Sequence, residues 1–323
     1  MTQVRLRLDP WPGDYEGALQ IEDFDQTPTA EIDTGVETGL WAAVPATPDQ
    51  PRPLRIAFID GVRRIDARVL GESASGQPVY GMFGSLAVGA VEVEGNRALV
   101  EKVVVRRYLI LGSNESFEAE ALQIGNVLVS FEPYSAVDGA PAAPMLALQN
   151  LMRSEEASLA EDLEASGACV FADGPLNYFS GRKHQTVGVI KRLYQAYIPG
   201  PQFALLSQLQ PGERTPVFAI RDGKYDRYAW YLRLVRPRAM EYGVSGVVRL
   251  EVRAGIGVDN AVVSANVSAR CLPGFASDAT RDPRSPQNLA PIGALELELR
   301  RRLGDAITIR RGIEKRLFEG LEV

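Results

Sequence analysis

The chain has 323 residues, 46% of them hydrophobic, which is enough for one large domain or two ordinary ones with a substantial core. Its 35 basic and 41 acidic residues give a formal net charge of −6, which excludes a protein that binds nucleic acid through a basic surface all round. This charge does not exclude an enzyme whose basic residues line a single groove. Only two cysteines, no signal peptide and no apolar run of membrane-spanning length together predict a soluble cytoplasmic protein.

Residues 1–53 are expected to form an arm or linker with little regular structure, and residues 54–323 a single folded domain. Four prolines punctuate the end of this arm: Pro45, Pro48, Pro51 and Pro53. Trp41 is costly to leave exposed, so the arm is expected to dock on the body or on a second subunit.

From residue 54 onwards, apolar runs and alternating patterns predict strands interrupted by three helices. Strands are expected within 54–60, 63–72, 78–94, 102–112, 168–174 and 246–254, and a strand that runs into more strand or a short helix over 186–198. A hairpin is expected over 215–235, turning at Asp222-Gly223. Helices are expected over about 145–165, ended by Gly167, over 259–271 and over 291–305. This order predicts an α/β fold with a mixed sheet rather than a parallel nucleotide-binding sheet.

Asp60 and Asp173 each end an apolar run and are each followed by glycine. Asp-Gly is ordinary turn chemistry, and that explanation remains open. The other explanation is that two strand ends bring two carboxylates together to hold metal ions, as metal-assisted phosphodiester hydrolysis requires. A third carboxylate can come from the acidic face of the helix over 145–165.

Five segments occur along the chain in a fixed order: FIDGVRRIDARV, LMRSEEASLAEDL, VFADGPL, VGVIK and PQNLAPIGALELELRRRLGD. In this order, over about residues 54–305, they resemble the bacterial branch of the NurA nuclease family. The resemblance implies an RNase H-like core with additional strands and helices, and a manganese-dependent 5′-end DNA nuclease. It also implies a homodimer that works with the hexameric HerA translocase to resect DNA ends in double-strand break repair, in the cytoplasm and near the nucleoid.

The resemblance also assigns site residues. The two aspartates of the family's motif fall on Asp60 and Asp173, and its helical glutamate falls on Glu156, with Glu155 left open as an alternative. Lys191 matches a basic position that meets a phosphate or orients a ligand. The ions implied are Mn²⁺ or Mg²⁺, two of them.

The chain departs from the family near its C-terminus, where archaeal members carry a metal-binding histidine. The one histidine of this chain is His184, in a polar segment, and the corresponding C-terminal position reads Gln287-Asn288. An amide oxygen from Asn288 is the expected fourth ligand, because amide oxygens coordinate Mn²⁺ and Mg²⁺. The alternative is a catalytically weak or inactive dimeric adaptor that docks on the translocase and regulates it. No phosphate-binding loop of the G-x-x-x-x-G-K-[ST] type occurs, so any ATP would be hydrolysed by the partner.

Basic clusters flank the two aspartates and the C-terminal helix: Arg63, Arg64 and Arg68, then Arg182 and Lys183, then Arg300, Arg301 and Arg302. Each could contact DNA phosphates or be a solvated surface. Tyr178 and Phe179 could stack on an unpaired base or belong to the core.

Overall fold

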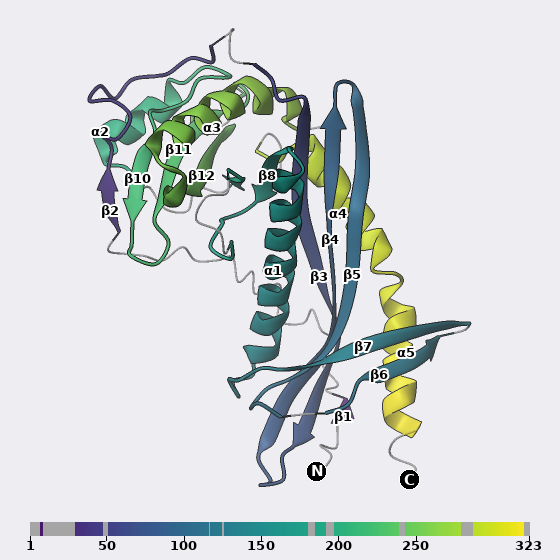
Figure 1. Ribbon diagram of the computed structural model, residues 1–323. Helices are drawn as coiled ribbons and strands as arrows, with labels where there is room; N and C mark the ends of the chain where they lie inside the picture. Colours follow the sequence, from purple (N-terminus) through teal and green to yellow (C-terminus); the bar gives the residue numbers. More distant parts are fainter. Residues whose placement is uncertain are drawn as a thin grey trace.

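The computed structural model describes residues 7–8, 30–47, 51–115, 117–124, 126–179, 185–191, 197–238, 243–278 and 287–319 (Figure 1). Its strands are β1 (Arg7–Leu8), β2 (Glu31–Asp33), β3 (Arg55–Glu72), β4 (Pro78–Glu94), β5 (Arg97–Leu111), β6 (Glu120–Ile124), β7 (Val127–Ser135), β8 (Cys169–Asp173), β9 (Val187–Ile190), β10 (Phe218–Arg221), β11 (Arg227–Arg233) and β12 (Val247–Arg253). Its α-helices are α1 (Ala143–Ala165), α2 (Gly200–Phe203), α3 (Val258–Cys271), α4 (Ala290–Arg302) and α5 (Ala306–Glu319). None of the described helices is long and apolar enough to cross a membrane.

One mixed sheet runs through the molecule in the order β2-β10-β11-β12-β9-β8-β3-β4-β5-β7-β6. Within it, β3, β4 and β5 are antiparallel neighbours, α1 follows, and β8 then returns parallel to β3 with β9 parallel to β8. The central order β5-β4-β3-β8-β9 is that of an RNase H-like core. The expected α/β class, the mixed sheet and this core are therefore confirmed, with β10–β12 and β6–β7 as additional strands on either side.

The sequence 55–72 forms one continuous strand of 18 residues rather than the two strands expected. β4 pairs with β3 along its whole length, and Gly61 lies opposite Val88 in this ladder. The expectation that β3 turns at Gly61 is therefore wrong, because the ladder with β4 carries the backbone straight through it. Asp60 lies inside a strand, not at its end.

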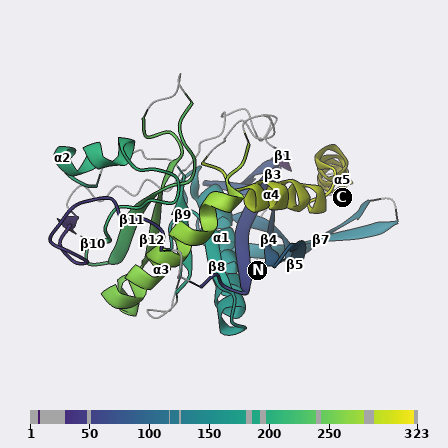
Figure 2. The same cartoon turned by 90° about the horizontal axis from the view of Figure 1, so that it is seen from above.

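Two helical layers cover the sheet because successive strand residues point to opposite faces. Ala57 and Ile59 pack with α1 on one face, whereas Ile56 and Phe58 pack with α3 and α4 on the other. Seen from above, α3 and α4 follow one another across the molecule (Figure 2).

Helix α1 begins with Pro144 in its first turn and buries Leu148, Met152 and Leu163 against the sheet. Gly167, with φ of +87°, ends it as expected. The Gly167 N–H donates to the Glu164 carbonyl and the Ala168 N–H to the Leu163 carbonyl, the paired bonds of a glycine-terminated helix end.

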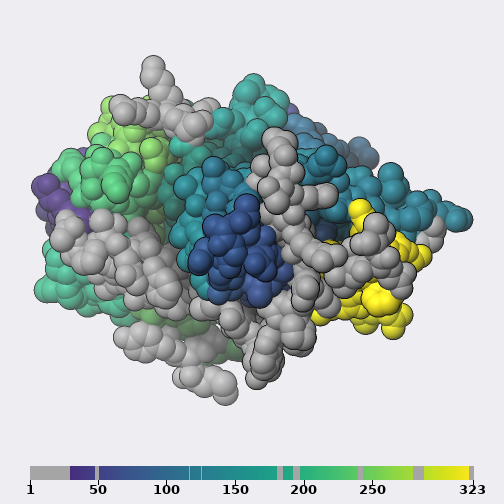
Figure 3. Space-filling view, turned by 90° about the horizontal axis from the view of Figure 1, so that it is seen from below, coloured from purple at the N-terminus to yellow at the C-terminus, as the bar shows by residue number. Residues whose placement is uncertain are grey.

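The described part of the arm docks on the body. Trp41 Nε1 donates to the Gln202 carbonyl at 3.1 Å, and its ring packs edge-on against Phe218. β2 adds to the sheet beside β10. β1 pairs with the C-terminal part of β3, at Val69 and Leu70. The space-filling view from below shows the far end of the β3–β4 ribbon at the surface, with α5 to one side (Figure 3).

Candidate active site

The two predicted aspartates lie side by side where β3 and β8 separate. The parallel ladder between these strands ends at the pair Ile59–Ala172, so the next residues on the two strands are Asp60 and Asp173. β8 ends there, and Gly174 follows with φ of +93°, a conformation that glycine adopts without strain. By strand alternation both carboxylates point to the face that carries α3 and α4.

Asp60 is almost fully buried, with 7% of its surface exposed. Burial raises its pKa well above the usual range of a carboxyl, and the charge of Asp173 raises it further, while the Lys191 ammonium opposes both. Glu156 and Glu296 also raise the pKa of Asp60. One oxygen, Oδ1, accepts a hydrogen bond from the Gly61 N–H at 2.8 Å. Asp60 on β3 therefore feels the charge of three other carboxylates, on β8, α1 and α4.

Lys191 follows β9 directly and lies beside Asp173. Its Nζ is 2.8 Å from Asp173 Oδ1, and Val189, two residues before Lys191, is the register partner of Asp173. The predicted basic position is thus next to the predicted acidic one.

Glu156 approaches from α1, on the other side of β3. It is 5% exposed, and a Cβ at Gly61 would collide with its carboxylate and with Met152 Cγ, so a larger residue there would force these side chains to move. Glu155, the alternative left open by the sequence, instead points to Arg106 at 3.5 Å on the surface side of α1. Glu156, and not Glu155, is therefore the glutamate that lies against β3 next to Asp60, although on the α1 face of the strand.

Arg153 links α1 to the end of β8 and was not anticipated from the sequence. Its guanidinium lies 2.8 Å from Glu156 Oε2 and donates to the Asp173 carbonyl at 2.9 Å. The signal available in the sequence is its position three residues before Glu156, which places both on one face of the helix.

Glu296 on α4 was also missed, because its segment reads as an ordinary amphipathic helix. Ile292 packs in the cluster that contains Phe58, and Leu295 packs in the cluster that contains Val62. Asp60 lies between Phe58 and Val62 on the same strand face, so Glu296 is carried towards it. Asn288, the predicted fourth ligand, is fully buried just before α4, and its carbonyl accepts from the Ser277 N–H at 2.9 Å.

The carboxylates suit a hard divalent cation in kind, since Mg²⁺ and Mn²⁺ prefer oxygen ligands. Their present spacing does not make a ready site, because among the described residues no three Asp, Glu, His or Cys side chains converge closely enough to hold an ion. Lys191 and Arg153 instead supply the positive charge beside Asp173 and Glu156. The Lys191 ammonium pairs with Oδ1 of Asp173.

The basic clusters close to the site are engaged within the protein. Arg64 lies 2.8 Å from Asp66 and donates to the Leu303 and Gly304 carbonyls at the end of α4. The arginines of α4 form ion pairs with Glu296 and Glu298 on the same helix. His184, Arg182 and Lys183 lie outside the described residues.

The two aromatic residues after Asp173 have different surroundings. Phe179 is 6% exposed and belongs to the core beneath α1. The Tyr178 hydroxyl donates to Asn150 Oδ1 at 2.7 Å, which ties the segment after β8 to α1.

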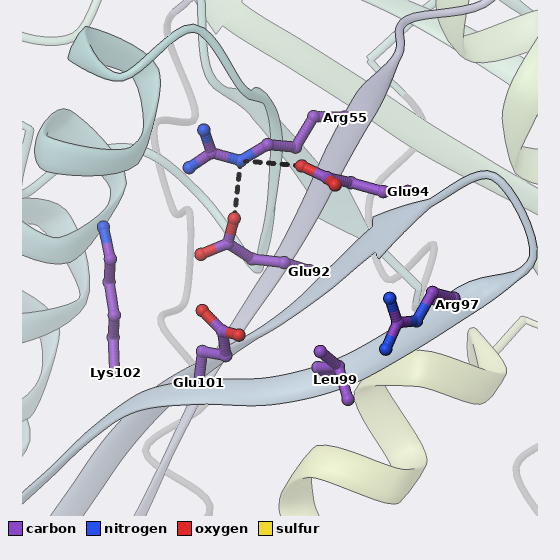
Figure 4. Close-up of a pocket in the computed structure, with 7 residues that line it drawn as sticks. All are labelled: Arg55, Glu92, Glu94, Arg97, Leu99, Glu101 and Lys102. Atoms are coloured by element: carbon purple, nitrogen blue, oxygen red, sulfur yellow. Dashed lines mark hydrogen bonds and ion pairs between the residues drawn. The ribbon is translucent and has the colours of Figure 1, made fainter.

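A separate charged pocket of about 340 Å³ lies at the start of β3, where β4 and β5 join (Figure 4). Glu92 and Glu94 point towards Arg55, whose Nε lies 2.6 Å from Glu92 Oε2 and 4.0 Å from Glu94 Oε1. Arg55 also donates to the Ser166 carbonyl at the end of α1. These contacts join β3, β4 and α1, so the pocket is explained by structural ion pairing.

No family model matches the chain, and no curated protein matches it in sequence. Among solved structures it is similar to the NurA nuclease from Sulfolobus solfataricus, with 12% identity over 87% of this chain and 88% of that one and a TM-score of 0.46. It is also similar to human ENDOV (13% identity, 80% and 85% of the two chains, TM-score 0.35) and to Endonuclease V from Bacillus subtilis (11% identity, 79% and 84%, TM-score 0.32).

Proposed function

We propose that this chain is a metal-dependent nuclease that hydrolyses phosphodiester bonds in DNA. The observation that carries the proposal is the pair Asp60–Asp173, side by side on two parallel strands of an RNase H-like core. Asp173, Glu156 and Glu296 each raise the pKa of the buried Asp60, and like charges near a buried carboxylate cost stability, so their presence favours a role that uses the charge.

Asp60, Asp173 and Glu156 would hold Mn²⁺ or Mg²⁺ ions, with the Asn288 amide oxygen as a further ligand. When bound, such ions activate a water molecule and stabilise the leaving oxygen of a phosphodiester. Lys191 carries a positive charge at the edge of the carboxylates, where it can pair with a phosphate oxygen once Asp173 is engaged elsewhere. Arg153 holds Glu156 and the Asp173 backbone in fixed relation.

The biological setting is proposed from the ordered sequence motifs. It comprises 5′-end resection of DNA in double-strand break repair, a homodimer, and a HerA-type hexameric ATPase that feeds the DNA strand to the site. A cytoplasmic, nucleoid-associated location and a single domain over 54–323 belong to the same proposal.

A second candidate is a catalytically weak or inactive adaptor that docks on the ATPase and regulates it. Two points favour it: the resemblance places Gln287-Asn288 where archaeal NurA proteins carry a histidine, and the Lys191 ammonium pairs with Asp173 Oδ1.

The test is digestion of end-labelled single- and double-stranded DNA with Mn²⁺, Mg²⁺ or EDTA, with and without a HerA-type ATPase. We expect metal-dependent cutting that Asp60→Ala, Asp173→Ala and Glu156→Ala each reduce by at least about a hundredfold. Glu155→Ala is the matched control, one residue away on the outer side of α1, and should cut like the wild type. No cutting in any metal, with the ATPase still bound, would favour the adaptor.

A further inference from the structure

The turn that follows Asp173 is held by a buried hydrogen-bond chain from the additional strands. This turn comprises Asp173, Gly174, Pro175 and Leu176, so it begins at the residue that carries the carboxylate. The Gly174 N–H donates to the Val189 carbonyl at 3.0 Å, and Pro175 has no N–H. The Leu176 N–H is therefore the remaining backbone donor of the turn.

That donor is taken by Tyr225. The Leu176 N–H donates to the Tyr225 hydroxyl oxygen at 2.7 Å and, at the longer distance of 3.3 Å, to Glu251 Oε1. The Tyr225 hydroxyl in turn donates to Glu251 Oε1. Tyr225 is 8% exposed and Glu251 is fully buried. Burial, and then the charge of Glu251, raise the pKa of Tyr225 well above its usual range, so its hydroxyl keeps the proton that it donates.

Glu251 is anchored by two arginines on the same sheet face. Arg227 Nε and Arg249 Nη2 each lie 3.4 Å from Glu251 Oε2. The guanidinium of Arg227 also lies 4.6 Å from the centre of the Tyr225 ring. Buried charges paired in this way hold their neighbours in one arrangement.

Tyr225 itself is placed by the hairpin between β10 and β11. Asp222 Oδ1 accepts from the Lys224 N–H at 3.0 Å and from the Tyr225 N–H at 2.5 Å, while Asp222 Oδ2 pairs with Arg227 at 3.0 Å. Strands outside the RNase H-like core therefore reach across β12 and β9 to the end of β8.

We propose that Tyr225 and Glu251 are positioning residues that hold the turn after β8, and through it the Asp173 carboxylate, in place for catalysis. This inference rests on the proposed nuclease function for its effect on activity. Its structural part, the hold on the Leu176 amide, stands without that function.

The experiment compares wild type, Tyr225→Phe and Tyr231→Phe. Tyr231 is a fully buried tyrosine of β11 in the cluster around Phe218, away from the turn, and serves as the matched control. The first readout, in EDTA, is hydrogen–deuterium exchange of residues 174–179. We expect exchange about tenfold faster in Tyr225→Phe, because its Leu176 N–H has lost its best acceptor, and wild-type exchange in Tyr231→Phe.

The second readout is the Mn²⁺ concentration for half-maximal DNA cutting. We expect Tyr225→Phe to need about tenfold more Mn²⁺, with kcat recovering at saturating metal, and Tyr231→Phe to match the wild type. A purely structural role would instead lower kcat and the melting temperature together and leave the metal requirement unchanged.

Wild-type exchange and an unchanged metal requirement in Tyr225→Phe would overturn the proposal while leaving the nuclease function intact. If the wild type does not cut DNA in any metal, the nuclease proposal fails, and the exchange rates still decide whether Tyr225 holds the turn. If Tyr225→Phe does not fold, Glu251→Gln takes its place, with faster exchange of the same segment expected and wild-type exchange overturning the proposal.

Discussion

The ionised carboxylate of a single residue, Asp60, lowers the stability of the folded chain. Its pKa is raised by burial first and then by Asp173, Glu156 and Glu296, so the ionised form is less favourable in the folded chain than in the unfolded one. A carboxyl whose pKa is raised on folding destabilises the fold above that pKa. This cost is relieved as the pH falls through the raised pKa towards the ordinary range of Asp.

Asp60→Asn should therefore stabilise the protein while abolishing cutting. In EDTA at neutral pH we expect its free energy of unfolding to rise by about 1 kcal/mol, measured by thermal or urea denaturation. The difference from the wild type should shrink as the pH is lowered. Glu155→Gln neutralises a partly exposed carboxylate on the outer side of α1 and should give no such gain. An unchanged or lower stability of Asp60→Asn would contradict the electrostatic account of the site.

At the scale of elements, the same dipeptide has two outcomes that the sequence alone does not separate. Asp60-Gly61 lies in the middle of β3 because β4 pairs along the whole strand, whereas Asp173-Gly174 ends β8 with a positive φ. The carboxylate pairing was predictable, since apolar runs mark both strands. The long ladder was not, because it depends on a partner elsewhere in the chain.

Helix α1 and its glycine stop were predictable from local signals, and so was the hairpin at Asp222-Gly223. The parts of the site that were missed, Arg153 and Glu296, sit on helices whose polar residues look alike in sequence. Which of them faces the strands is decided by tertiary packing, such as Leu295 against Val62. The choice between Glu155 and Glu156 required the same information.

Gly188 shows how closely β9 approaches the turn after β8. A Cβ at this position would lie 2.7 Å from the Gly174 carbonyl oxygen, 3.1 Å from Leu176 Cγ and 3.2 Å from Glu251 Cγ. We expect Gly188→Ala to lower the free energy of unfolding by about 2 kcal/mol in urea denaturation, because the nearest atom belongs to the backbone and cannot rotate away. Gly200→Ala, where nothing lies within 4 Å of the added Cβ, should have little effect. Equal stability of both variants would mean that the turn has room to shift.

At the scale of the whole molecule, the charge distribution works against DNA binding unless the site is neutralised. The net charge is −6, and the arginines of α4 and Arg64 are paired within the protein. A phosphate that approaches Asp60 and Asp173 meets like charge, so bound divalent ions or neutral side chains should favour binding there.

The double variant Asp60→Asn with Asp173→Asn should bind a short single-stranded DNA about tenfold more tightly than the wild type. The dissociation constants are measured by fluorescence anisotropy, in EDTA at low salt. The variant Glu94→Gln with Glu101→Gln changes the net charge by the same amount, from −6 to −4, but at the pocket of Figure 4. If DNA phosphates enter the carboxylate site, only the first pair of substitutions should tighten binding. An equal gain from both would mean that DNA responds to the overall charge alone, and the phosphate would then have to be placed elsewhere on the molecule.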